Sequence, residues 1–129
     1  MYAFSYTVPA AAAAPISFVI AGSGEVPEGR ANYRDHIVSP GDVSASGMRA
    51  KVRFVREEME RRLAGFGLGW RDVTATQVYT IRNFHECLAD ELVASGAADH
   101  GLTLHVCRPP IVGLDFEMDC RGIAREIVV

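Results

Sequence analysis

A short segment near the end of the chain carries the carboxylates best suited to acid–base chemistry. Residues 114–120, LDFEMDC, alternate strictly between apolar and acidic side chains, and successive side chains of a strand point to opposite faces. Glu117 therefore lies on the polar side of a predicted strand, where a carboxylate in a cleft can hold or deprotonate a water molecule. Glu117 is our candidate catalytic residue. The alternative is an exposed strand carboxylate without a role, flanked by Asp115 and Asp119.

Three further side chains have suitable chemistry but a weaker context. His105 lies in a predicted apolar strand, 102–107. It contacts a ligand, or it is a histidine of the core or of an interface. Glu25 and Tyr33 border the loop that follows a predicted strand at 16–21. We place these three residues among the candidates for substrate binding, apart from Glu117.

The cysteines and histidines do not form a metal-binding pattern. The three cysteines, Cys87, Cys107 and Cys120, include no C-x-x-C pair, and the four histidines lack H-x-x-x-H spacing. A structural zinc site is therefore not expected, and we predict no metal. An odd number of widely spaced thiols fits a reducing compartment, and we expect Cys107 to be a buried, inert thiol.

The length and composition predict one globular domain, since the chain has 129 residues and a mass of 14.0 kDa. About half of the residues are apolar (49%) and 22% are charged, which is typical of a globular protein. The 13 basic and 16 acidic residues give a net charge of −3, whereas nucleic-acid binders usually have a basic excess. Composition therefore argues against a nucleic-acid partner.

The apolar segment 8–22 predicts neither a signal peptide nor a membrane span. The first basic residue is Arg30, so the positive region of a signal peptide is missing. Pro9 and Pro15 interrupt the segment, which leaves it too short to cross a bilayer. We therefore expect a cytoplasmic protein without a membrane partner.

The hydrophobic patterns predict two helices among several strands. The clearest helix runs over 42–64, where apolar residues recur at steps of three or four, and Asp42 or Ser44 can cap its start. Its Arg–Glu pairs four residues apart form either a solvated face or an interaction surface. A second helix is predicted to begin at Asn83, with Glu86 completing a capping box. Strands are expected at 2–8, 16–21, 72–81, 102–107 and 114–120, the last extended by the tail past a bulge near Gly122.

This order of elements predicts an α+β sandwich with a mixed sheet of about five to six strands. Two helices are too few to cover both faces of such a sheet, so we expect them to share one face. An uncovered face of Val, Ile and Phe would then form a large apolar patch, which favours oligomerisation.

Four segments in order resemble the Rid (YjgF) family. They are SGEVP at 23–27, the helix 42–64 with its glycine turn, the strand from Asp72-Val73 to Tyr79, and FEMDC at 116–120. The resemblance covers about residues 16–124 and implies a chorismate-mutase-like α+β fold and a homotrimer with clefts between its subunits. The best-known branch of the family hydrolyses reactive enamines or imines to a keto acid and ammonia. No metal or organic cofactor takes part, so the resemblance implies no cofactor here.

The resemblance also implies roles for individual residues. Glu117 falls on the family's glutamate, which helps to position water. Ser23 falls on a loop serine whose hydroxyl can bond a substrate group, although Ser23 can equally serve the turn alone. The arginine that clamps the substrate carboxylate should lie where this chain has Gly101-Leu102. Arg108 is the nearest substitute, but it most resembles a structural arginine of the family.

Two other substrate-holding positions of the family also differ, with Leu88 near the helical asparagine and Ala10 near the N-terminal tyrosine. Since an arginine–carboxylate pair is strong and specific, either another arginine serves, or the ligand lacks that carboxylate, or the site is catalytically silent. We therefore expect a divergent branch of the family that catalyses hydrolytic deamination, or a related addition of water, on a small metabolite bound between subunits. The alternative is a non-catalytic trimer that binds a small ligand. Ribonuclease activity fits poorly with the net charge of −3.

Overall fold

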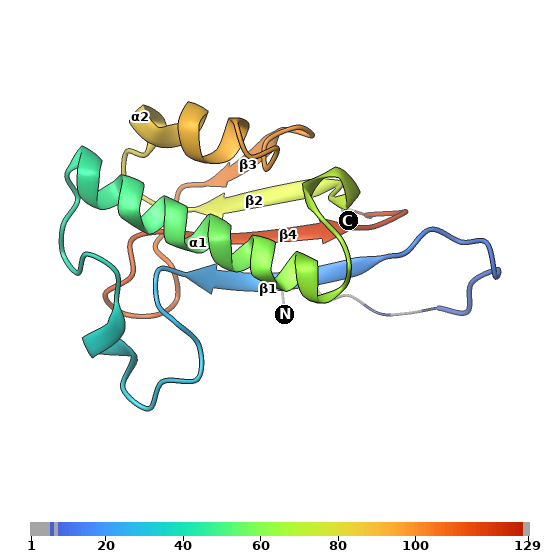
Figure 1. The fold of residues 1–129 in the computed structure, drawn as a ribbon, viewed down its shortest axis with the longest axis horizontal. Coiled ribbons are helices and arrows are strands. Elements are labelled where there is room, and N and C mark those ends of the chain that lie inside the picture. Colours follow the sequence, from blue (N-terminus) through green and yellow to red (C-terminus); the bar gives the residue numbers. More distant parts are fainter. Residues whose placement is uncertain (1–5, 7, 128–129) are drawn as a thin grey trace.

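The computed structural model describes residue 6 and residues 8–127, and within them a single mixed sheet with α1 lying across one face (Figure 1). The sheet order is β1–β4–β2–β3, in which β4 is antiparallel to both of its neighbours and β2 and β3 are parallel. Because parallel strands need a crossover, the second helical segment lies between β2 and β3 in the chain. The strands are β1 (Phe18–Gly24), β2 (Ala75–Tyr79), β3 (Leu102–His105) and β4 (Glu117–Gly122).

The long helix α1 (Ala45–Gly65) packs against β1 and β4. Of its two predicted caps, Ser44 is the one that acts, because its hydroxyl accepts a hydrogen bond from the Gly47 N–H (3.2 Å). Asp42 instead accepts from the Ser44 N–H (2.9 Å) and so supports the cap. The predicted apolar face is buried in the core. It consists of Met48, Val52, Val55, Met59 and Leu63.

The second helical segment differs from the prediction. A single turn, α2 (His85–Cys87), continues as a π-helical segment, η3 (Leu88–Val93). Asn83 accepts a hydrogen bond from the His85 N–H (3.0 Å), as a capping residue does. However, the N-cap position is Phe84, so Glu86 is one residue too early to complete the predicted capping box.

The described part of the chain holds four strands, fewer than the five to six predicted. The predicted strand 2–8 falls largely outside the described residues. The tail does not extend β4, because the Ile123 N–H donates to the Thr74 hydroxyl (3.0 Å) rather than to a strand carbonyl. Residues 114–116 are also not a strand, because two of their N–H groups donate to the Glu25 carboxylate. Residues 72–74 and 80–81 of the predicted strand lie outside β2, and Asp72 is the last residue of a short 3₁₀ turn, η2 (Trp70–Asp72).

The face of the sheet opposite α1 is polar, so the predicted apolar face of Val, Ile and Phe was wrong. Strand alternation places apolar side chains such as Val78 and Met118 toward the helices, where they are fully buried. Val19 is an exposed apolar residue on the other face. An uncovered apolar patch therefore gives no reason to expect oligomerisation of this chain.

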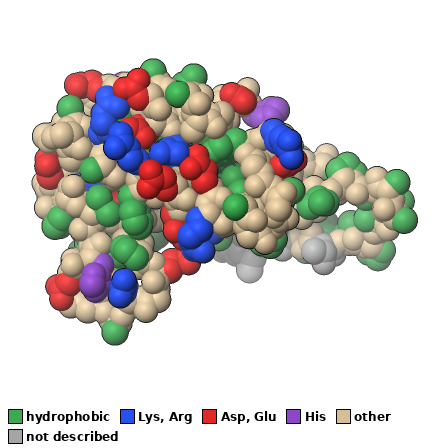
Figure 2. Space-filling model, in the orientation of Figure 1, with side chains coloured by type: hydrophobic (Ala, Val, Ile, Leu, Met, Phe, Trp, Pro, Cys, Tyr) green, Lys and Arg blue, Asp and Glu red, His purple; other side chains and the backbone are tan. Residues whose placement is uncertain are grey.

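The charged face of α1 is more than a solvated surface. Figure 2 shows basic and acidic side chains interleaved on this side of the molecule. Three arginines of α1 face the acidic residues of η3, so the face helps to hold α1 and η3 together. Of the predicted pairs four residues apart within the helix, Arg56–Glu60 (2.8 Å) and Glu58–Arg62 (3.4 Å) form. The contacts to η3 are Arg49–Asp90 (2.7 Å), Arg53–Glu91 (2.6 Å) and Arg56–Glu91 (3.7 Å).

Candidate functional site

Three strands meet at one end of the sheet. The parallel strands β2 and β3 end at Tyr79 and His105, and the antiparallel β4 begins beside them at Glu117. Thr80 ties these ends together, since its N–H donates to the His105 carbonyl (3.2 Å) and its hydroxyl to the Asp115 carbonyl (2.6 Å). Figure 1 shows the long loops after β1 and β3 leaving from the same end. Side chains from distant segments therefore converge here.

A group of polar residues on the uncovered face of this end forms what we call the sheet-end cluster. The Tyr79 hydroxyl donates to Asp119 Oδ2 (2.6 Å) and lies 2.7 Å from Gln77 Oε1. His105 Nε2 lies 2.8 Å from the same amide oxygen, and its ring stacks on Tyr79 with centroids 4.7 Å apart. Burial raises the pKa of Tyr79, and Asp119 raises it further, so Tyr79 stays a neutral donor.

Glu117 completes the sheet-end cluster as its least constrained member. Its carboxylate lies over Gly22 in the irregular part of β1, where a Cβ would overlap Glu117 Oε1. No described residue donates a hydrogen bond to that carboxylate. Burial raises the pKa of Glu117, and the negative charges of Asp119 and Glu25 raise it further. This half-buried carboxylate can therefore both give and take a proton closer to neutral pH than an exposed glutamate can.

Two of the predicted substrate-binding residues are engaged in the fold instead. Glu25 is fully buried, and its carboxylate accepts hydrogen bonds from the N–H groups of Asp115 (2.5 Å) and Phe116 (3.0 Å). Ser23 is also buried, and its hydroxyl accepts from Arg62 (3.1 Å) on the helix side of the sheet. In this chain neither side chain faces the sheet-end cluster.

The other two candidates lie on the loops next to this end of the sheet. Arg108 is exposed and lines a cavity of about 540 Å³ between the loop after β1 and the loop after β3. Tyr33 is the first residue of a 3₁₀ turn, η1 (Tyr33–His36), and is half-buried. Its neighbour Arg34, which the sequence analysis did not single out, is the residue of this turn that lines the cavity.

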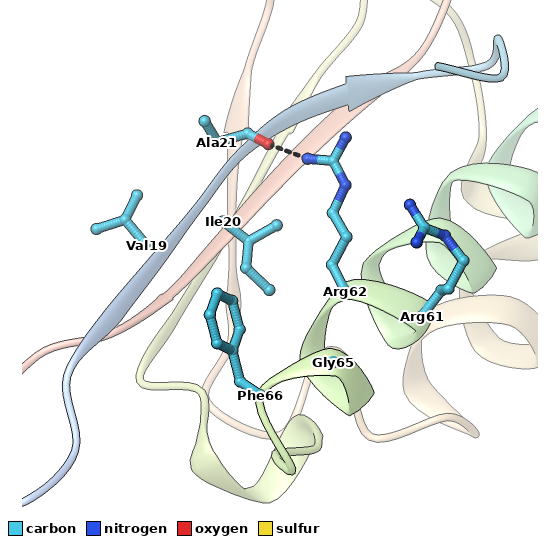
Figure 3. Close-up of a pocket in the computed structure, with 7 residues that line it drawn as sticks. All are labelled: Val19, Ile20, Ala21, Arg61, Arg62, Gly65 and Phe66. Atoms are coloured by element: carbon cyan, nitrogen blue, oxygen red, sulfur yellow. Dashed lines mark hydrogen bonds between the residues drawn. The ribbon is translucent and has the colours of Figure 1, made fainter. Parts of the chain in front are cut away.

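A smaller cavity of about 390 Å³ lies between β1 and the end of α1 (Figure 3). Figure 3 shows Arg62 reaching the carbonyl oxygen of Ala21, a hydrogen bond of 2.9 Å. Arg62 also pairs with Glu28 and Glu58, and Arg61 pairs with Glu58. Because both guanidinium groups already have acidic partners, this cavity offers little free positive charge to a ligand.

Sequence reasoning missed Gln77, Tyr79 and Asp119 as members of the cluster. The signal was present, because residues two apart on a strand share a face and both strands were predicted. The pairing register, which the sequence does not show, puts Tyr79 opposite Glu117 and Gln77 opposite Asp119. The expectation for Cys107 was wrong, since this thiol is exposed in the loop after β3.

Neither a metal site nor a membrane helix is found among the residues that the structure describes. They contain no group of three or more His, Cys, Asp or Glu side chains arranged to hold a metal ion. Their helices also lack the length and apolar character needed to span a bilayer.

Comparison with known proteins identifies the family of this chain. A family profile described as "2-aminomuconate deaminase CnbZ" matches residues 1–127, nearly the whole chain. The chain belongs to the CnbZ family. The curated protein "2-amino-5-chloromuconate deaminase" of Comamonas testosteroni is 49% identical over 130 residues. That match covers 100% of this chain and 52% of the relative, so the chain spans about half the length of the curated relative it matches.

Solved structures show the same fold at low sequence identity. The Rid family protein YyfB from Yersinia pestis has a TM-score of 0.59 and 19% identity, and covers 82% of this chain and 77% of its own. The YjgF gene product of E. coli has a TM-score of 0.59 and 17% identity, with coverage of 84% and 81%. E. coli TdcF, solved with bound serine, has a TM-score of 0.57 and 15% identity, with coverage of 84% and 81%. The predicted Rid/YjgF membership and its α+β fold are thereby confirmed.

Proposed function

We propose that this chain is a hydrolytic deaminase. Its substrate is a small unsaturated amino acid in the enamine or imine form, and 2-aminomuconate is the first candidate. The names of the relatives support this, since the CnbZ profile and the Comamonas protein are both described as aminomuconate deaminases. The chain covers only half of that protein. Its activity therefore has to be measured on this chain itself.

The reaction needs one water molecule and two proton transfers to substrate atoms. An enamine holds its amino group on a carbon–carbon double bond, and protonation of the far carbon gives an iminium ion. Water then adds to the iminium carbon and loses a proton. The nitrogen takes up a proton and leaves as ammonia, and the new hydroxyl group loses its proton as the carbonyl forms. The products are a keto acid and ammonia. A single carboxyl group beside the substrate can act as acid and base in turn.

The observation that carries this proposal is the half-buried carboxylate of Glu117 with its raised pKa. A proton-transfer group works best when its pKa lies near the operating pH, and burial moves the pKa of Glu117 in that direction. In the described structure its carboxylate is not held by a salt bridge, unlike those of Glu25 and Glu91, and so it remains available to water and substrate. Tyr79, paired opposite Glu117, and His105, stacked on Tyr79, place two further polar side chains beside it.

The proposal includes a homotrimer with the site between subunits. The sheet-end cluster lies on the face that α1 leaves uncovered, so a second copy over this face would exclude water from Glu117. Exclusion of water strengthens the electrostatic interactions in a site. The Rid/YjgF fold of the structural neighbours supports this arrangement by analogy only.

The test is ammonia release from freshly generated 2-aminomuconate, compared with the spontaneous rate. We expect the chain to accelerate this release. With 2-aminoacrylate we expect little or no acceleration, because its carboxylate would need the family's arginine, which this chain lacks at Gly101-Leu102. No acceleration with 2-aminomuconate would refute the proposed activity. Equal turnover of both substrates would show that another residue has replaced the clamp.

One observation favours a second candidate, a trimer that binds a small ligand without turnover. The position of the family's clamp holds Gly101, an exposed residue with φ of +83° and open space around it, followed by Leu102, which packs on the core. No guanidinium therefore extends from this segment. Saturable binding of muconate without ammonia release from 2-aminomuconate would favour this candidate.

A further inference from the structure

The larger cavity lies at the same end of the sheet as Glu117. Three of its lining residues follow or precede the strand ends of the cluster by only two or three positions. Arg82 lies three residues after Tyr79, Arg108 three residues after His105, and Asp115 two residues before Glu117. Two residues of extended chain span about 7 Å. The cavity and the sheet-end cluster are therefore close neighbours.

Two arginines that line this cavity have no acidic partner within the described part of the chain. Arg34, on η1, and Arg108, on the loop after β3, form no salt bridge with any described residue. Elsewhere the arginines are mostly paired, as Arg62 shows in the smaller cavity. An arginine without a partner, on the wall of a cavity, is suited to bind a carboxylate from outside the chain.

The remaining charges in the cavity already compensate one another. Its single acidic lining residue, Asp115, accepts hydrogen bonds from Lys51 (2.5 Å) and from Arg82 (2.8 Å). Burial would raise the pKa of Asp115, but these two cations hold it below its ordinary value. The positive charges of Arg34 and Arg108 are consequently left over for a ligand.

The rest of the cavity wall is largely apolar. It includes Ile37, Pro110 and Ile111, from the loops after β1 and β3. The two loops meet where Ile37 packs on Gly113, so closely that a Cβ there would lie 3.2 Å from Ile37 Cδ1. Asn32 fixes the turn that carries Arg34, since it accepts from the Arg34 N–H (3.2 Å) and donates to Asp35 (2.7 Å). The cavity thus combines an apolar slot with positive charge.

We propose that Arg34 and Arg108 form a binding site for one carboxylate of an unsaturated amino dicarboxylate. The carboxylate that they bind is the one remote from the amino group. The hydrocarbon chain lies along the apolar wall, and the amino-bearing end extends to Glu117. This assignment rests on the proposed function and adds its selectivity: a dicarboxylate is held by its second carboxylate, in place of the clamp that Gly101 cannot provide.

The experiment measures binding of muconate, the same dicarboxylate without an amino group, by titration calorimetry of the full chain. Arg34→Gln and Arg108→Gln remove one positive charge each from exposed positions, so both variants are expected to fold. Arg71→Gln is the matched control, because Arg71 is exposed on η2, before the opposite end of β2. We expect each cavity variant to weaken muconate binding by about 10- to 100-fold, and the control by less than about twofold.

Two results would overturn the carboxylate site. One is wild-type affinity in both Arg34→Gln and Arg108→Gln, and the other is no muconate binding to the wild type at millimolar concentration. The proposed function fails separately, if muconate binds with the expected arginine dependence but 2-aminomuconate releases no ammonia. Conversely, ammonia release whose KM is unchanged in both variants would remove the carboxylate site and leave the deaminase.

Discussion

At the scale of single residues, Glu117 combines a raised pKa with freedom from structural bonds. The other buried carboxylates are committed to the fold, because Glu25 accepts two backbone N–H groups and Asp115 is held by two cations. Glu117 instead pays a desolvation cost without a compensating partner among the described residues. Groups in this condition are more often functional than structural.

The raised pKa predicts a stability change for Glu117→Gln. Above the ordinary glutamate pKa of about 4.3 the unfolded chain carries the charge freely, whereas the folded chain holds it at a cost. The folded state therefore loses stability as the pH rises from that value through the raised pKa. Glu117→Gln should raise the melting temperature at pH 7 and leave it unchanged near pH 4. Thermal melts at both pH values check this, and a lower melting temperature of the variant at pH 7 would contradict it.

The contact of Glu117 with Gly22 predicts a second change, Gly22→Ala. The new methyl group would overlap Glu117 Oε1, the end of a flexible side chain, so the carboxylate must move while the backbone keeps its place. Displacement of a catalytic group by about 1 Å can cost about 10²-fold in rate. We expect a loss of kcat/KM of this order, with stability changed by less than about 1 kcal/mol. The control is Gly65→Ala, because a Cβ at Gly65 meets nothing within 4 Å; equal kcat/KM in the two variants would contradict the placement of Glu117.

Alternation of side chains along one strand was enough to place Glu117 on the polar side of β4. Its catalytic role, which the family resemblance implies, stays a prediction. Glu25 was misjudged because its role depends on backbone groups that lie 90 and 91 residues further along the chain. No local pattern encodes such a contact. The position of Arg34 in the cavity wall was likewise not predictable, because it depends on contact between its loop and Gly113.

At the scale of elements, the single lysine of the chain joins α1 to the loop before β4. Lys51 is fully buried and donates to Asp115 (2.5 Å), with Glu25 Oε1 at 3.6 Å. Glu25 in turn holds the N–H groups that would otherwise extend β4. This buried group of charges fixes where β4 begins, and so fixes the position of Glu117.

Lys51→Met should therefore be strongly destabilising, because it leaves two buried carboxylates with one cation fewer. Removal of one partner of a buried ion pair typically costs about 3–5 kcal/mol, and we expect about 3 kcal/mol here, since Arg82 still pairs with Asp115. Urea unfolding at pH 7 measures the loss. Arg53→Gln is the control on the exposed side of α1, where a loss of about 1 kcal/mol or less is expected. A loss for Lys51→Met no larger than that of the control would contradict the account.

Most of the elements could be predicted from the sequence, and the exceptions have local causes. The apolar repeats of α1 and the β-rich segments around β2 and β4 are strong signals. The early end of β4 is not, because it depends on a hydrogen bond from Ile123 to the distant Thr74 hydroxyl. The π-helical segment η3 is not either, and its acidic residues pair with arginines of α1 that lie far away in the sequence. The polarity of the uncovered face also needed the pairing register, which decides the face of every strand residue.

At the scale of the whole molecule, the uncovered sheet face predicts an assembly despite its polarity. The sheet-end cluster is half-buried in the single chain, and a site that must exclude water gains from a covering subunit. Sedimentation equilibrium should give about three times the chain mass of 14.0 kDa. A monomer at micromolar concentration would contradict the trimer, and would require the cluster to act without a covering subunit.

The central claim is that Glu117 transfers protons in the hydrolysis of an aminomuconate. Its most direct test is kcat/KM for ammonia release from 2-aminomuconate by the wild type and by Glu117→Gln, prepared side by side. Glu57→Gln, on the exposed face of α1, is the control for the loss of one negative charge. We predict a loss of about 10²- to 10⁴-fold for Glu117→Gln, and no loss for the control. Turnover by Glu117→Gln at the wild-type rate would contradict the claim.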